Sequence, residues 1–425
     1  MSPWAGRTLH FVGIGGAGMS GWARVARQLG ATVSGTDRAD GPALAGLREL
    51  GATINVGHAA AHVPDGAEVV YSSAIPADNP ERAHARAHGW HERPRAELLH
   101  ELTTLKRTIA IAGAHGKTTT TSMIAHALLA LGAEPGYLIG GTLSTTGQNA
   151  DWGAGEWLVV EADESDRSML ALDVDIAVVT NVELDHHATF GSLREVEAVF
   201  ATFLAGPPHA VLPDEPAVRS LRGDRPAAVF TAPKVPLDLR VPGEHNQCNA
   251  AAALEALALA GFGRTEAVAA LATFGGAGRR FEELGRTPAG ARVVDDYAHH
   301  PTEVAAVIAA AREVTAGRVI AVFQPHLFSR TQALAAEFGA ALAAADVPVV
   351  LDVYPARERA DDFPGVTGRV VAAAVADARP GHDVLWLPRF SDVLWALAPR
   401  LRPDDLVLVL GAGDVDALGR ALVAG

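Results

Sequence analysis

Short apolar runs alternate along the chain with glycine-containing turns and with Ala- and Leu-rich stretches of helical periodicity. This pattern is typical of βα units on a parallel sheet. It begins three times, with strands predicted at Thr8–Gly13, at Thr108–Gly113 and from Val293 onward. The first two strands precede predicted helices that end near Leu29 and Leu131. The sequence therefore predicts an α/β protein of three domains.

Domain boundaries are expected where the composition changes. Charged residues crowd around Pro94, and a Gly-rich segment runs from Phe274 to Gly285. Such stretches are typical of linkers between domains. We expect domains at residues 1–98, 99–280 and 281–425, which agrees with the usual size of about 150 residues for a domain.

Composition and charge narrow the class of protein. Hydrophobic residues make up 49% of the chain and charged residues 20%, without an apolar run long enough to cross a bilayer. A formal net charge of -14 disfavours a polyanionic partner, so we expect neither nucleic acid nor a membrane as partner. Cys248 is the only cysteine, and the first residues lack the pattern of a secretory signal. We expect a cytoplasmic protein.

The segment AGAHGKTTTT, between a predicted strand and a helix, has the features of a phosphate-binding loop. Gly113 and Gly116 let backbone N–H groups face a phosphate, Lys117 can reach the β- and γ-phosphates, and the Thr118 hydroxyl can bind Mg²⁺. The spacing is shorter than that of the standard loop. The alternative interpretation is a turn with an exposed lysine.

A second glycine-rich turn, GIGGAGMSG, matches the pattern G-x-G-x-x-G at Gly13, Gly15 and Gly18. Asp37 closes the next predicted strand, where a ribose-binding acid is expected. A nucleotide diphosphate fits the N-terminus of the following helix. Tight βα turns also use glycine for packing alone, and the pattern does not distinguish NAD from a UDP-sugar.

Acidic and histidine residues follow two further predicted strands. The segment EADESD begins at Glu161, and VELDHH contains Asp185 and His186. The carboxyl ends of parallel strands meet at one edge of a sheet, so we expect these groups beside the phosphate-binding loop. A single histidine is more often a surface or capping residue. Together with Thr118, however, this set predicts a metal–phosphate centre.

Three polar clusters lie downstream. Asn246 and Asn249 are three residues apart on a predicted helix, where side-chain amides could read an adenine edge, although capping explains one of them. The segments DDYAHHPTE and FQPHLFSRT each follow a strand and precede a helix, which places their polar residues in βα loops. These residues are Asp296, Tyr297, His299, His300, His326 and Arg330. The guanidinium of Arg330 is suited to bind a carboxylate.

These motifs occur in the order found in the Mur ligases, and the sequence resembles that family through all three predicted domains. The motifs that carry the resemblance are GIGGAGMSG, AGAHGKTTTT, EADESD, TNVELDHH, HNQCNAAAAL, GRRFE, DDYAHHPTE and QPHLFSRT. The first-domain turn and DDYAHHPTE are most similar to the members that join L-alanine to UDP-N-acetylmuramate. The resemblance implies an N-terminal Rossmann-like UDP-binding domain and a central P-loop ATPase domain with a mostly parallel sheet. A C-terminal Rossmann-like domain would bind the amino acid and complete the ATP site.

The resemblance also implies roles for individual residues. ATP would be bound by Gly113, His115, Gly116, Lys117, Thr118, Thr119, Asn246, Asn249, Arg280 and Asp296. One Mg²⁺ would be held by Thr118 and Glu161, and a second Mg²⁺ would be bound by His186. The UDP-sugar would be bound by Gly15, Gly16, Ala17, Gly18, Met19, Ser20, Asp37, Ser72 and Ser73. The alanine would be lined by Tyr297, His299, His326 and Arg330, and the catalytic residues would be Lys117, Glu161, His186 and Arg280.

The implied reaction is an ATP-dependent ligation in the synthesis of peptidoglycan precursors. The γ-phosphoryl group would pass to the lactyl carboxylate of UDP-N-acetylmuramate, and the amine of L-alanine would attack the acyl phosphate. His299 and His326 are candidates by type for accepting the amine proton. Three alternatives remain: a ligase that adds a whole peptide in wall recycling, a nucleotide-driven switch, and an NAD-dependent dehydrogenase. We expect a monomer or a weak homodimer.

Three positions depart from the family pattern. His187 and Ala188 follow His186 where the family has an apolar residue and then Asp, and Leu327 stands where many members have an arginine. We therefore expect the residues around the metal bound by His186 to differ from those of the family. We also expect one arginine contact fewer, at the position of Leu327.

Overall fold

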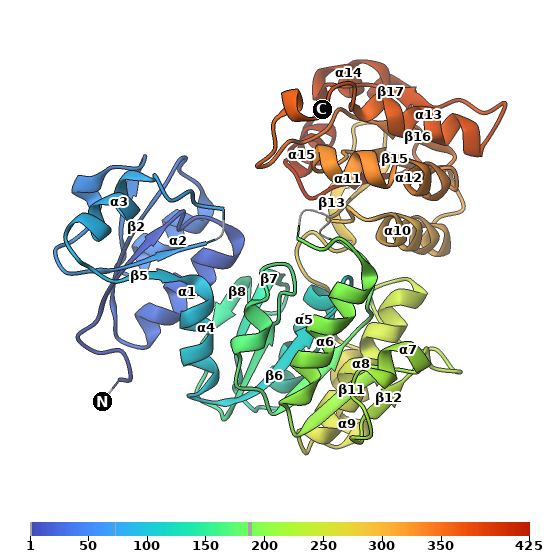
Figure 1. Cartoon of the computed structure of the whole chain (residues 1–425). Helices are drawn as coiled ribbons and strands as arrows, with labels where there is room; N and C mark the ends of the chain where they lie inside the picture. The colour runs from blue at the N-terminus through green and yellow to red at the C-terminus, as the bar shows by residue number, and fades with distance from the viewer. Residues whose placement is uncertain (1, 73, 186–188) are drawn as a thin grey trace. The chain divides into compact units, whose positions relative to one another are not determined.

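The computed structural model describes residues 2–72, 74–185 and 189–425. Its contacts divide the chain into two units. Unit 1 comprises Met1–Glu183, Arg194–Thr231 and Asn249–Phe274, and unit 2 comprises Leu184–Leu193, Ala232–Cys248 and Gly275–Gly425. The described residues form three sheets, two in unit 1 and one in unit 2 (Figure 1).

The first sheet is parallel throughout, in the order β3-β2-β1-β4-β5. Its strands are β1 (Thr8–Val12), β2 (Thr32–Asp37), β3 (Thr53–Val56), β4 (Glu68–Tyr71) and β5 (Glu92–Pro94). Its helices are α1 (Ala17–Gln28), α2 (Pro42–Glu49), α3 (Pro80–Ala87) and α4 (Arg95–Thr103). Strand β1 is central, and its residues after Thr8 are buried, which places the glycine-rich turn at the middle of the sheet edge.

The second sheet has the order β12-β11-β10-β6-β9-β7-β8, with β8 antiparallel to β7. Its strands are β6 (Arg107–Ala112), β7 (Gly136–Leu143), β8 (Gln148–Asp151), β9 (Trp157–Glu161), β10 (Ile176–Val179), β11 (His209–Pro213) and β12 (Ala228–Phe230). The helices are α5 (Lys117–Ala130), α6 (Leu193–Ala205), α7 (Pro216–Ser220), α8 (Glu244–Leu259) and α9 (Arg264–Leu271). Helix α5 is buried from Thr118 to Leu128, so its N-terminus is held in a fixed place at the end of β6.

The third sheet has the order β13-β14-β18-β15-β16-β17, with β13 antiparallel to β14. Its strands are β13 (Glu282–Arg286), β14 (Arg292–Asp296), β15 (Val319–Phe323), β16 (Val347–Val350), β17 (Leu385–Trp386) and β18 (Leu406–Leu410). The helices are α10 (Pro301–Val314), α11 (Phe328–Ala333), α12 (Ala335–Leu342), α13 (Gly368–Ala378), α14 (Phe390–Ala396) and α15 (Asp416–Ala424). Short 3₁₀ turns lie at Ala60–His62, Ser168–Ala171, Ala360–Asp362 and Ala398–Arg400.

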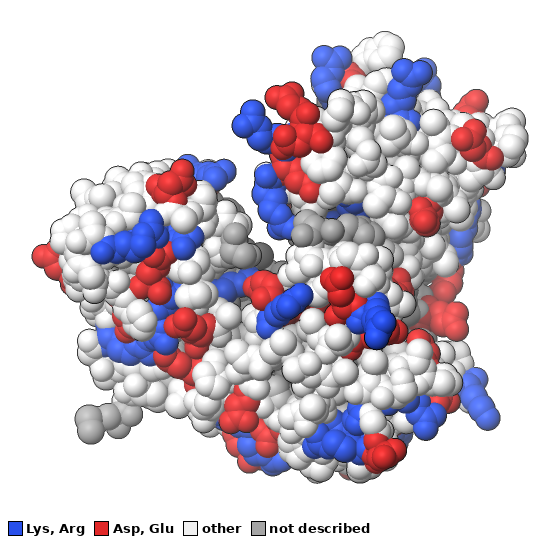
Figure 2. All heavy atoms as spheres, in the orientation of Figure 1, with Lys and Arg blue, Asp and Glu red and all other residues white. Residues whose placement is uncertain are grey.

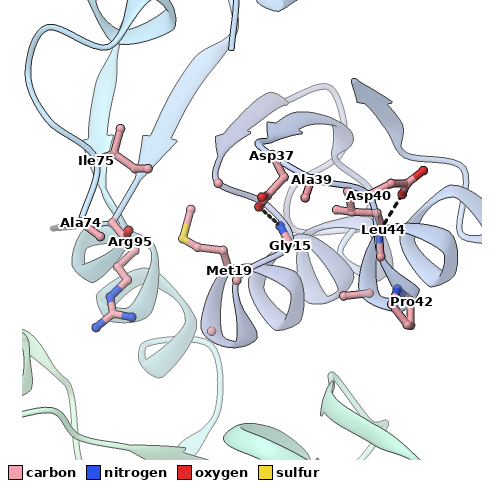
Figure 3. Close-up of a pocket in the computed structure, with 16 residues that line it drawn as sticks. Gly15, Met19, Asp37, Ala39, Asp40, Pro42, Leu44, Ala74, Ile75 and Arg95 are labelled. Atoms are coloured by element: carbon pink, nitrogen blue, oxygen red, sulfur yellow. Dashed lines mark hydrogen bonds between the residues drawn. The ribbon is translucent and has the colours of Figure 1, made fainter. Parts of the chain in front are cut away.

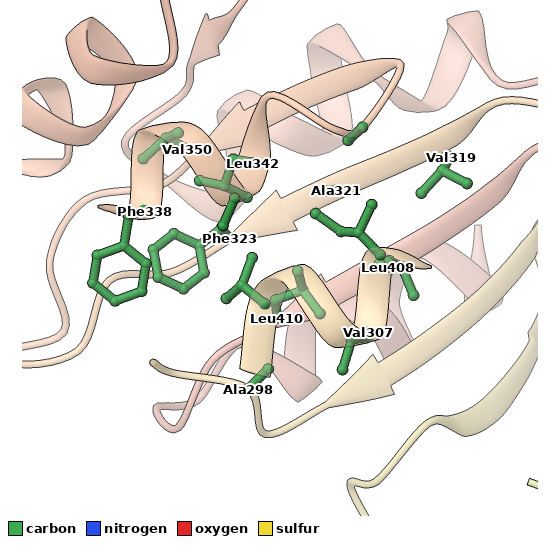
Figure 4. Packing of buried hydrophobic residues seen from close by; sticks show 14 of the residues in the cluster. Ala298, Val307, Val319, Ala321, Phe323, Phe338, Leu342, Val350, Leu408 and Leu410 are labelled. Carbon is green, nitrogen blue, oxygen red and sulfur yellow. The ribbon is translucent and has the colours of Figure 1, made fainter. Parts of the chain in front are cut away.

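Side chains of the third sheet alternate between two apolar cores. Phe323 and Leu410 belong to the cluster that includes Phe338 of α12 (Figure 4). Their strand neighbours Val322 and Val409 belong to a separate cluster. Helices therefore cover both faces of this sheet, as expected for parallel strands that are apolar throughout.

The three mostly parallel sheets confirm the predicted fold class. The antiparallel strands β8 and β13 were not predicted, because their sequences, QNAD and EELGR, are too polar to be recognised as strands.

None of the helices in the described part of the chain combines the length and the apolar character that a membrane crossing requires. On the face drawn in Figure 2, acidic and basic side chains are interspersed. The expected absence of a nucleic-acid partner stays a prediction from the net charge.

Candidate active site

A pocket of about 510 Å³ lies at the carboxyl end of the first sheet, beside the glycine-rich turn (Figure 3). Six residues predicted to bind the UDP-sugar line it: Gly15, Gly16, Gly18, Met19, Asp37 and Ser72. They follow β1, β2 and β4, three neighbouring strands. The topology of the sheet thus gathers this part of the predicted site.

Asp37 holds the glycine-rich turn. Its Oδ2 accepts a hydrogen bond of 2.8 Å from the backbone N–H of Gly15. A Cβ atom on Gly15 would lie 3.0 Å from that oxygen and 3.2 Å from Leu44, so glycine permits the close approach. Asp37, which the sequence pattern predicts to bind a ribose, therefore also fixes the conformation of the glycine-rich turn.

Three other residues were predicted to bind the UDP-sugar: Ala17, Ser20 and Ser73. Ser20 is buried within α1 and accepts a hydrogen bond of 3.2 Å from the Asn149 side chain of β8, and it is not among the residues that line the pocket. The side chain of Ala17 and the whole of Ser73 lie outside the described residues.

The phosphate-binding loop connects β6 to α5. Gly113 and Gly116 have positive φ angles of 142° and 80°. A Cβ atom on Gly113 would overlap the Thr180 hydroxyl, and one on Gly116 would lie 2.5 Å from Asn249 Oδ1. Both the backbone angles and the neighbouring atoms therefore require glycine.

Two residues after β10 hold this loop, and the sequence analysis missed both. The Thr180 hydroxyl donates to the carbonyl of His115 at 2.5 Å, while Asn181 accepts from the N–H of His115 at 3.0 Å and donates to its carbonyl at 2.9 Å. His115 Nε2 lies 3.2 Å from a Glu183 carboxylate oxygen. The available signal was their position directly after a predicted strand.

Lys117 is the first residue of α5, and its ammonium group lies 3.1 Å from both carboxylate oxygens of Glu164. It also contacts the carbonyl of Gly113. Burial favours the neutral amine, but Glu164 and Asp163 outweigh it and raise the pKa of Lys117. The lysine is therefore a largely buried cation, with 17% of its side chain exposed, and not the exposed residue of the alternative interpretation.

Side chains with oxygen atoms that can bind a metal ion lie near Lys117. Thr118 and Thr119 are buried in the first turn of α5. Glu161 ends β9 opposite Ile111 of β6, and its carboxylate accepts from the Gly140 N–H at 2.6 Å. Hydroxyl and carboxylate oxygens are the ligands that Mg²⁺ prefers. His186, the expected ligand of a second Mg²⁺, lies outside the described residues, as do His187 and Ala188.

Arg95 connects the acidic segment to the first-domain pocket. Its guanidinium Nη2 lies 3.3 Å from carboxylate oxygens of Asp163 and Asp166, and the same residue lines the pocket. Burial raises the pKa of Asp163, but Lys117, Ser165 and Arg95 together lower it. The segment EADESD therefore carries counter-ions for Lys117 of the phosphate-binding loop and for Arg95 of α4.

The two predicted adenine-binding residues lie on α8. Asn249 faces Gly116 of the phosphate-binding loop within unit 1. The Asn246 side chain donates to the Pro242 carbonyl at 2.6 Å within unit 2.

In unit 2, Asp296 ends β14 and is almost fully buried. Its carboxylate accepts hydrogen bonds of 2.8 Å from the N–H groups of Phe281 and Ala298, and burial raises its pKa to about 6. Arg280 lies 3.7 Å from Glu303, with its guanidinium 5.2 Å from the ring centroid of Tyr297. Asp296 thus shapes the turn that presents Tyr297.

His299 and His326 lie close together, with ring centroids 6.2 Å apart. Burial is the main cause that lowers the pKa of His299 to about 3 and that of His326 to about 4. Both imidazoles are therefore neutral at pH 7. An imidazole with so low a pKa is a poor proton acceptor. His300, the neighbouring residue, caps α10 together with Glu303.

Arg330 binds a carboxylate, as its type suggested, but that of Asp185. Its Nη2 and Nε lie 2.8 and 3.2 Å from Asp185 Oδ1, and both side chains are buried. Its Nη1 lies 3.4 Å from His326 Nδ1. Asp185 belongs to unit 2 by its contacts.

Leu327, which departs from the family pattern, is buried at the start of α11 and has a φ of 70°.

Family models match the chain in three consecutive parts. The Mur ligase catalytic domain matches residues 8–107, the Mur ligase middle domain matches residues 111–232, and the Mur ligase glutamate ligase domain matches residues 279–413. The chain belongs to the Mur ligase family. Each model corresponds to one of the three sheets.

The Mur ligases that this chain resembles in sequence are also similar to it in length. UDP-N-acetylmuramate–L-alanine ligases of Thermobifida fusca and of a Nocardioides species are 44% and 46% identical, over 98% and 97% of this chain and 96% and 94% of theirs. The structure of UDP-N-acetylmuramate–alanine ligase from Thermotoga maritima matches with a TM-score of 0.84 and 28% identity, over 98% of both chains. A murein peptide ligase from Psychrobacter arcticus matches with a TM-score of 0.72 and 23% identity, over 99% of this chain and 98% of that one.

Within this Mur ligase, the structure groups the predicted residues into three sets. The first set lines the pocket of the first sheet, the second surrounds Lys117, and the third surrounds Arg330 in unit 2. Four residues that the motifs did not single out complete them: Glu164, Thr180, Asn181 and Arg95.

Proposed function

We propose that this protein joins L-alanine to the lactyl carboxylate of UDP-N-acetylmuramate and consumes ATP, releasing ADP and phosphate. The observation that carries the proposal is the pairing of two loops in unit 1: a glycine-rich turn with a pocket suited to a nucleotide diphosphate, and a phosphate-binding loop with a largely buried lysine cation. The names of relatives that are 42 to 46% identical support the choice of substrates.

The phosphate-binding loop would bind ATP. The N-terminus of α5 and the backbone N–H groups of the loop attract phosphate oxygens. The ammonium of Lys117 would move from Glu164 to the β- and γ-phosphates, close to where it lies now. Its charge would reduce the repulsion between the γ-phosphoryl group and the attacking carboxylate.

Thr118 and Glu161 would hold Mg²⁺, because both offer oxygen ligands at the same sheet edge. The ion would neutralise negative charge on the transferring phosphoryl group. A second Mg²⁺ would be bound by His186, as the family resemblance implies.

The residues of unit 2 would bind the amino acid. Arg330, the neutral imidazoles of His299 and His326, and the ring of Tyr297 would orient alanine so that its uncharged amine attacks the acyl carbon. A C–N bond forms, the C–O bond to the phosphoryl group breaks, and the departing phosphate takes up the proton that the nitrogen loses. The low pKa values argue for orientation by the two histidines and against general-base roles.

We also propose that the chain has three domains, with boundaries near residues 98 and 280. The first position lies within α4, and the second lies inside the Gly-rich segment, just before β13. The proposal also includes a cytoplasmic location and a monomeric or weakly dimeric state.

The experiment supplies ATP, Mg²⁺ and UDP-N-acetylmuramate with either L-alanine or the tripeptide L-alanyl-γ-D-glutamyl-meso-diaminopimelate, and identifies products by mass. The proposal expects UDP-N-acetylmuramoyl-L-alanine, with one phosphate released for each product formed. Faster ligation of the tripeptide would indicate the peptide ligase of wall recycling. Phosphate release without ligation would indicate the nucleotide-driven switch.

A further inference from the structure

A buried charged network lies directly beneath the glycine-rich turn of the first domain. Its centre is Glu81, the second residue of α3, whose side chain is fully buried. The carboxylate accepts a hydrogen bond of 2.7 Å from the Thr36 hydroxyl and one of 3.0 Å from the Ala59 N–H. The motifs did not single out Glu81.

Two histidines complete the network. His10 Nε2 lies 3.4 Å from one carboxylate oxygen of Glu81, and His58 Nδ1 lies 3.3 Å from the other. The opposite ring nitrogen of His10 lies 2.8 Å from the Ser34 hydroxyl. Burial acts to raise the pKa of Glu81, but the hydrogen bonds and the nearby histidines outweigh burial and lower the pKa. The group is therefore an ionised carboxylate.

Thr36 links this network to the turn. Its backbone carbonyl accepts hydrogen bonds of 2.8 Å from Gly13 N–H and 2.9 Å from Ile14 N–H. The next residue, Asp37, accepts from the Gly15 N–H at 2.8 Å. Three consecutive N–H groups of the turn are therefore held by two consecutive residues of β2, and the side chain of Thr36 is held by Glu81.

Stability alone does not account for a buried carboxylate at this place. Removing a carboxylate from water is costly, and apolar residues of similar volume often stabilise a protein as well or better. A satisfied polar network, in contrast, fixes the groups that it joins. Here it fixes the strand end that positions the turn.

We propose that Glu81 is a positioning residue for the nucleotide-sugar pocket: through Thr36 it holds the glycine-rich turn in the conformation that receives the diphosphate. The identity of the ligand, UDP-N-acetylmuramate, rests on the proposed function. The positioning itself rests on the hydrogen bonds from Glu81 to the turn.

The test compares Glu81→Gln with the wild-type protein. We expect the dissociation constant of UDP-N-acetylmuramate, measured by calorimetry, to rise about tenfold, because a neutral amide presents N–H groups to donors that need an acceptor. The KM for ATP should stay within twofold. Hydrogen exchange at the amides of Gly13, Ile14 and Gly15 should be faster without ligand, while exchange in β6 should not change.

Thr36 variants keep the test decisive if Glu81→Gln does not fold. Thr36→Val keeps the shape and removes the hydroxyl, so it should weaken UDP-N-acetylmuramate binding about threefold and accelerate exchange in the turn. Thr36→Ser restores the hydroxyl and should restore both values. Asp405→Asn is the matched control, since Asp405 is a buried carboxylate bound by Arg318 in unit 2.

Unchanged binding and unchanged exchange in the turn of Glu81→Gln would overturn the inference. Equal weakening of UDP-N-acetylmuramate and ATP binding would also overturn it, since that result indicates general destabilisation. If the wild-type protein binds no UDP-N-acetylmuramate, the proposed function fails instead. The exchange measurement then still decides whether Glu81 holds the turn.

Discussion

Unit 1 contains the same local structure twice: a central strand, a glycine-rich turn and a helix. The first instance runs from β1 to α1 and the second from β6 to α5. In the first, side chains and carbonyls of β2 hold the backbone N–H groups of the turn, and residues 13–21 include no cationic side chain. In the second, Lys117 lies at the helix start with Glu164 as its counter-ion.

The difference agrees with what each turn would bind under the proposed function. A diphosphate that is carried through the reaction unchanged needs only fixed donors, which backbone N–H groups and a helix N-terminus supply. A phosphoryl group that is transferred from ADP to a carboxylate needs a cation on a flexible side chain, which can stay close to the negative charge as the group moves. The first turn is therefore expected to control affinity, and the second to control chemistry.

Replacement of Lys117 gives the largest expected effect. Lys117→Ala should lower ligase turnover by more than about 100-fold, because it removes the charge that acts on the transferring phosphoryl group. Binding of UDP-N-acetylmuramate to the first turn should not change. Lys106→Ala is the control, since Lys106 donates to the carbonyls of Trp152 and Gly153 and not to the loop. Turnover of Lys117→Ala within tenfold of wild type would contradict the account.

Alanine in the two turns should have unequal effects. Gly113→Ala forces a φ of 142° on alanine and an overlap with Thr180, so ligation should fall steeply and the free energy of unfolding should decrease by about 1–3 kcal/mol. Gly15→Ala needs only small shifts, and should raise the KM for UDP-N-acetylmuramate about fivefold.

Gly46→Ala serves as the control for both, because the nearest neighbouring atom would lie 4.0 Å from the added Cβ within helix α2. Steady-state kinetics and thermal unfolding measure the three variants. Equal losses in Gly15→Ala and Gly113→Ala would remove the distinction between the turns.

Glu161→Gln should raise the Mg²⁺ concentration for half-maximal activity about tenfold, because the amide keeps the shape but loses the charge that binds the ion. Titration with Mg²⁺ at saturating ATP measures this change. The first turn should be unaffected, so the KM for UDP-N-acetylmuramate should stay at its wild-type value. A Mg²⁺ titration that does not change would remove Glu161 from the metal site.

The smallest effect is expected for Asp37→Asn. One acceptor for the Gly15 N–H is weakened, so the KM for UDP-N-acetylmuramate should rise about threefold, with no change in the KM for ATP. The exposed Asp78→Asn, in the same domain, controls for the loss of one negative charge. A larger effect on ATP than on the UDP-sugar would contradict the separate roles of the two turns.

Local patterns in the sequence were sufficient to predict the fold class and both turns. Each strand, turn and helix at Thr8–Gln28 and Arg107–Ala130 is contiguous, so periodicity and glycine spacing identify it. The polar edge strands β8 and β13 gave no such signal. Their position depends on pairing with a neighbour rather than on their own apolar pattern.

Pairs of side chains from distant parts of the chain could not be predicted. Glu164 lies 47 residues after Lys117, and Asp185 lies 145 residues before Arg330. Which of several acids in EADESD faces the lysine depends on how the loop after β9 folds, and spacing along the sequence does not specify it. The same holds for Glu81, whose partners come from three other segments.

The transfer of oxygen tests the central claim, that the two turns act together to phosphorylate the sugar carboxylate. UDP-N-acetylmuramate labelled with ¹⁸O in its lactyl carboxylate is incubated with ATP, Mg²⁺ and L-alanine, and the released phosphate is analysed by mass. The account predicts one ¹⁸O atom in each phosphate, because the carboxylate oxygen that attacks the γ-phosphorus leaves with it. Phosphate without the label would show that ATP is hydrolysed by water, and would contradict the account.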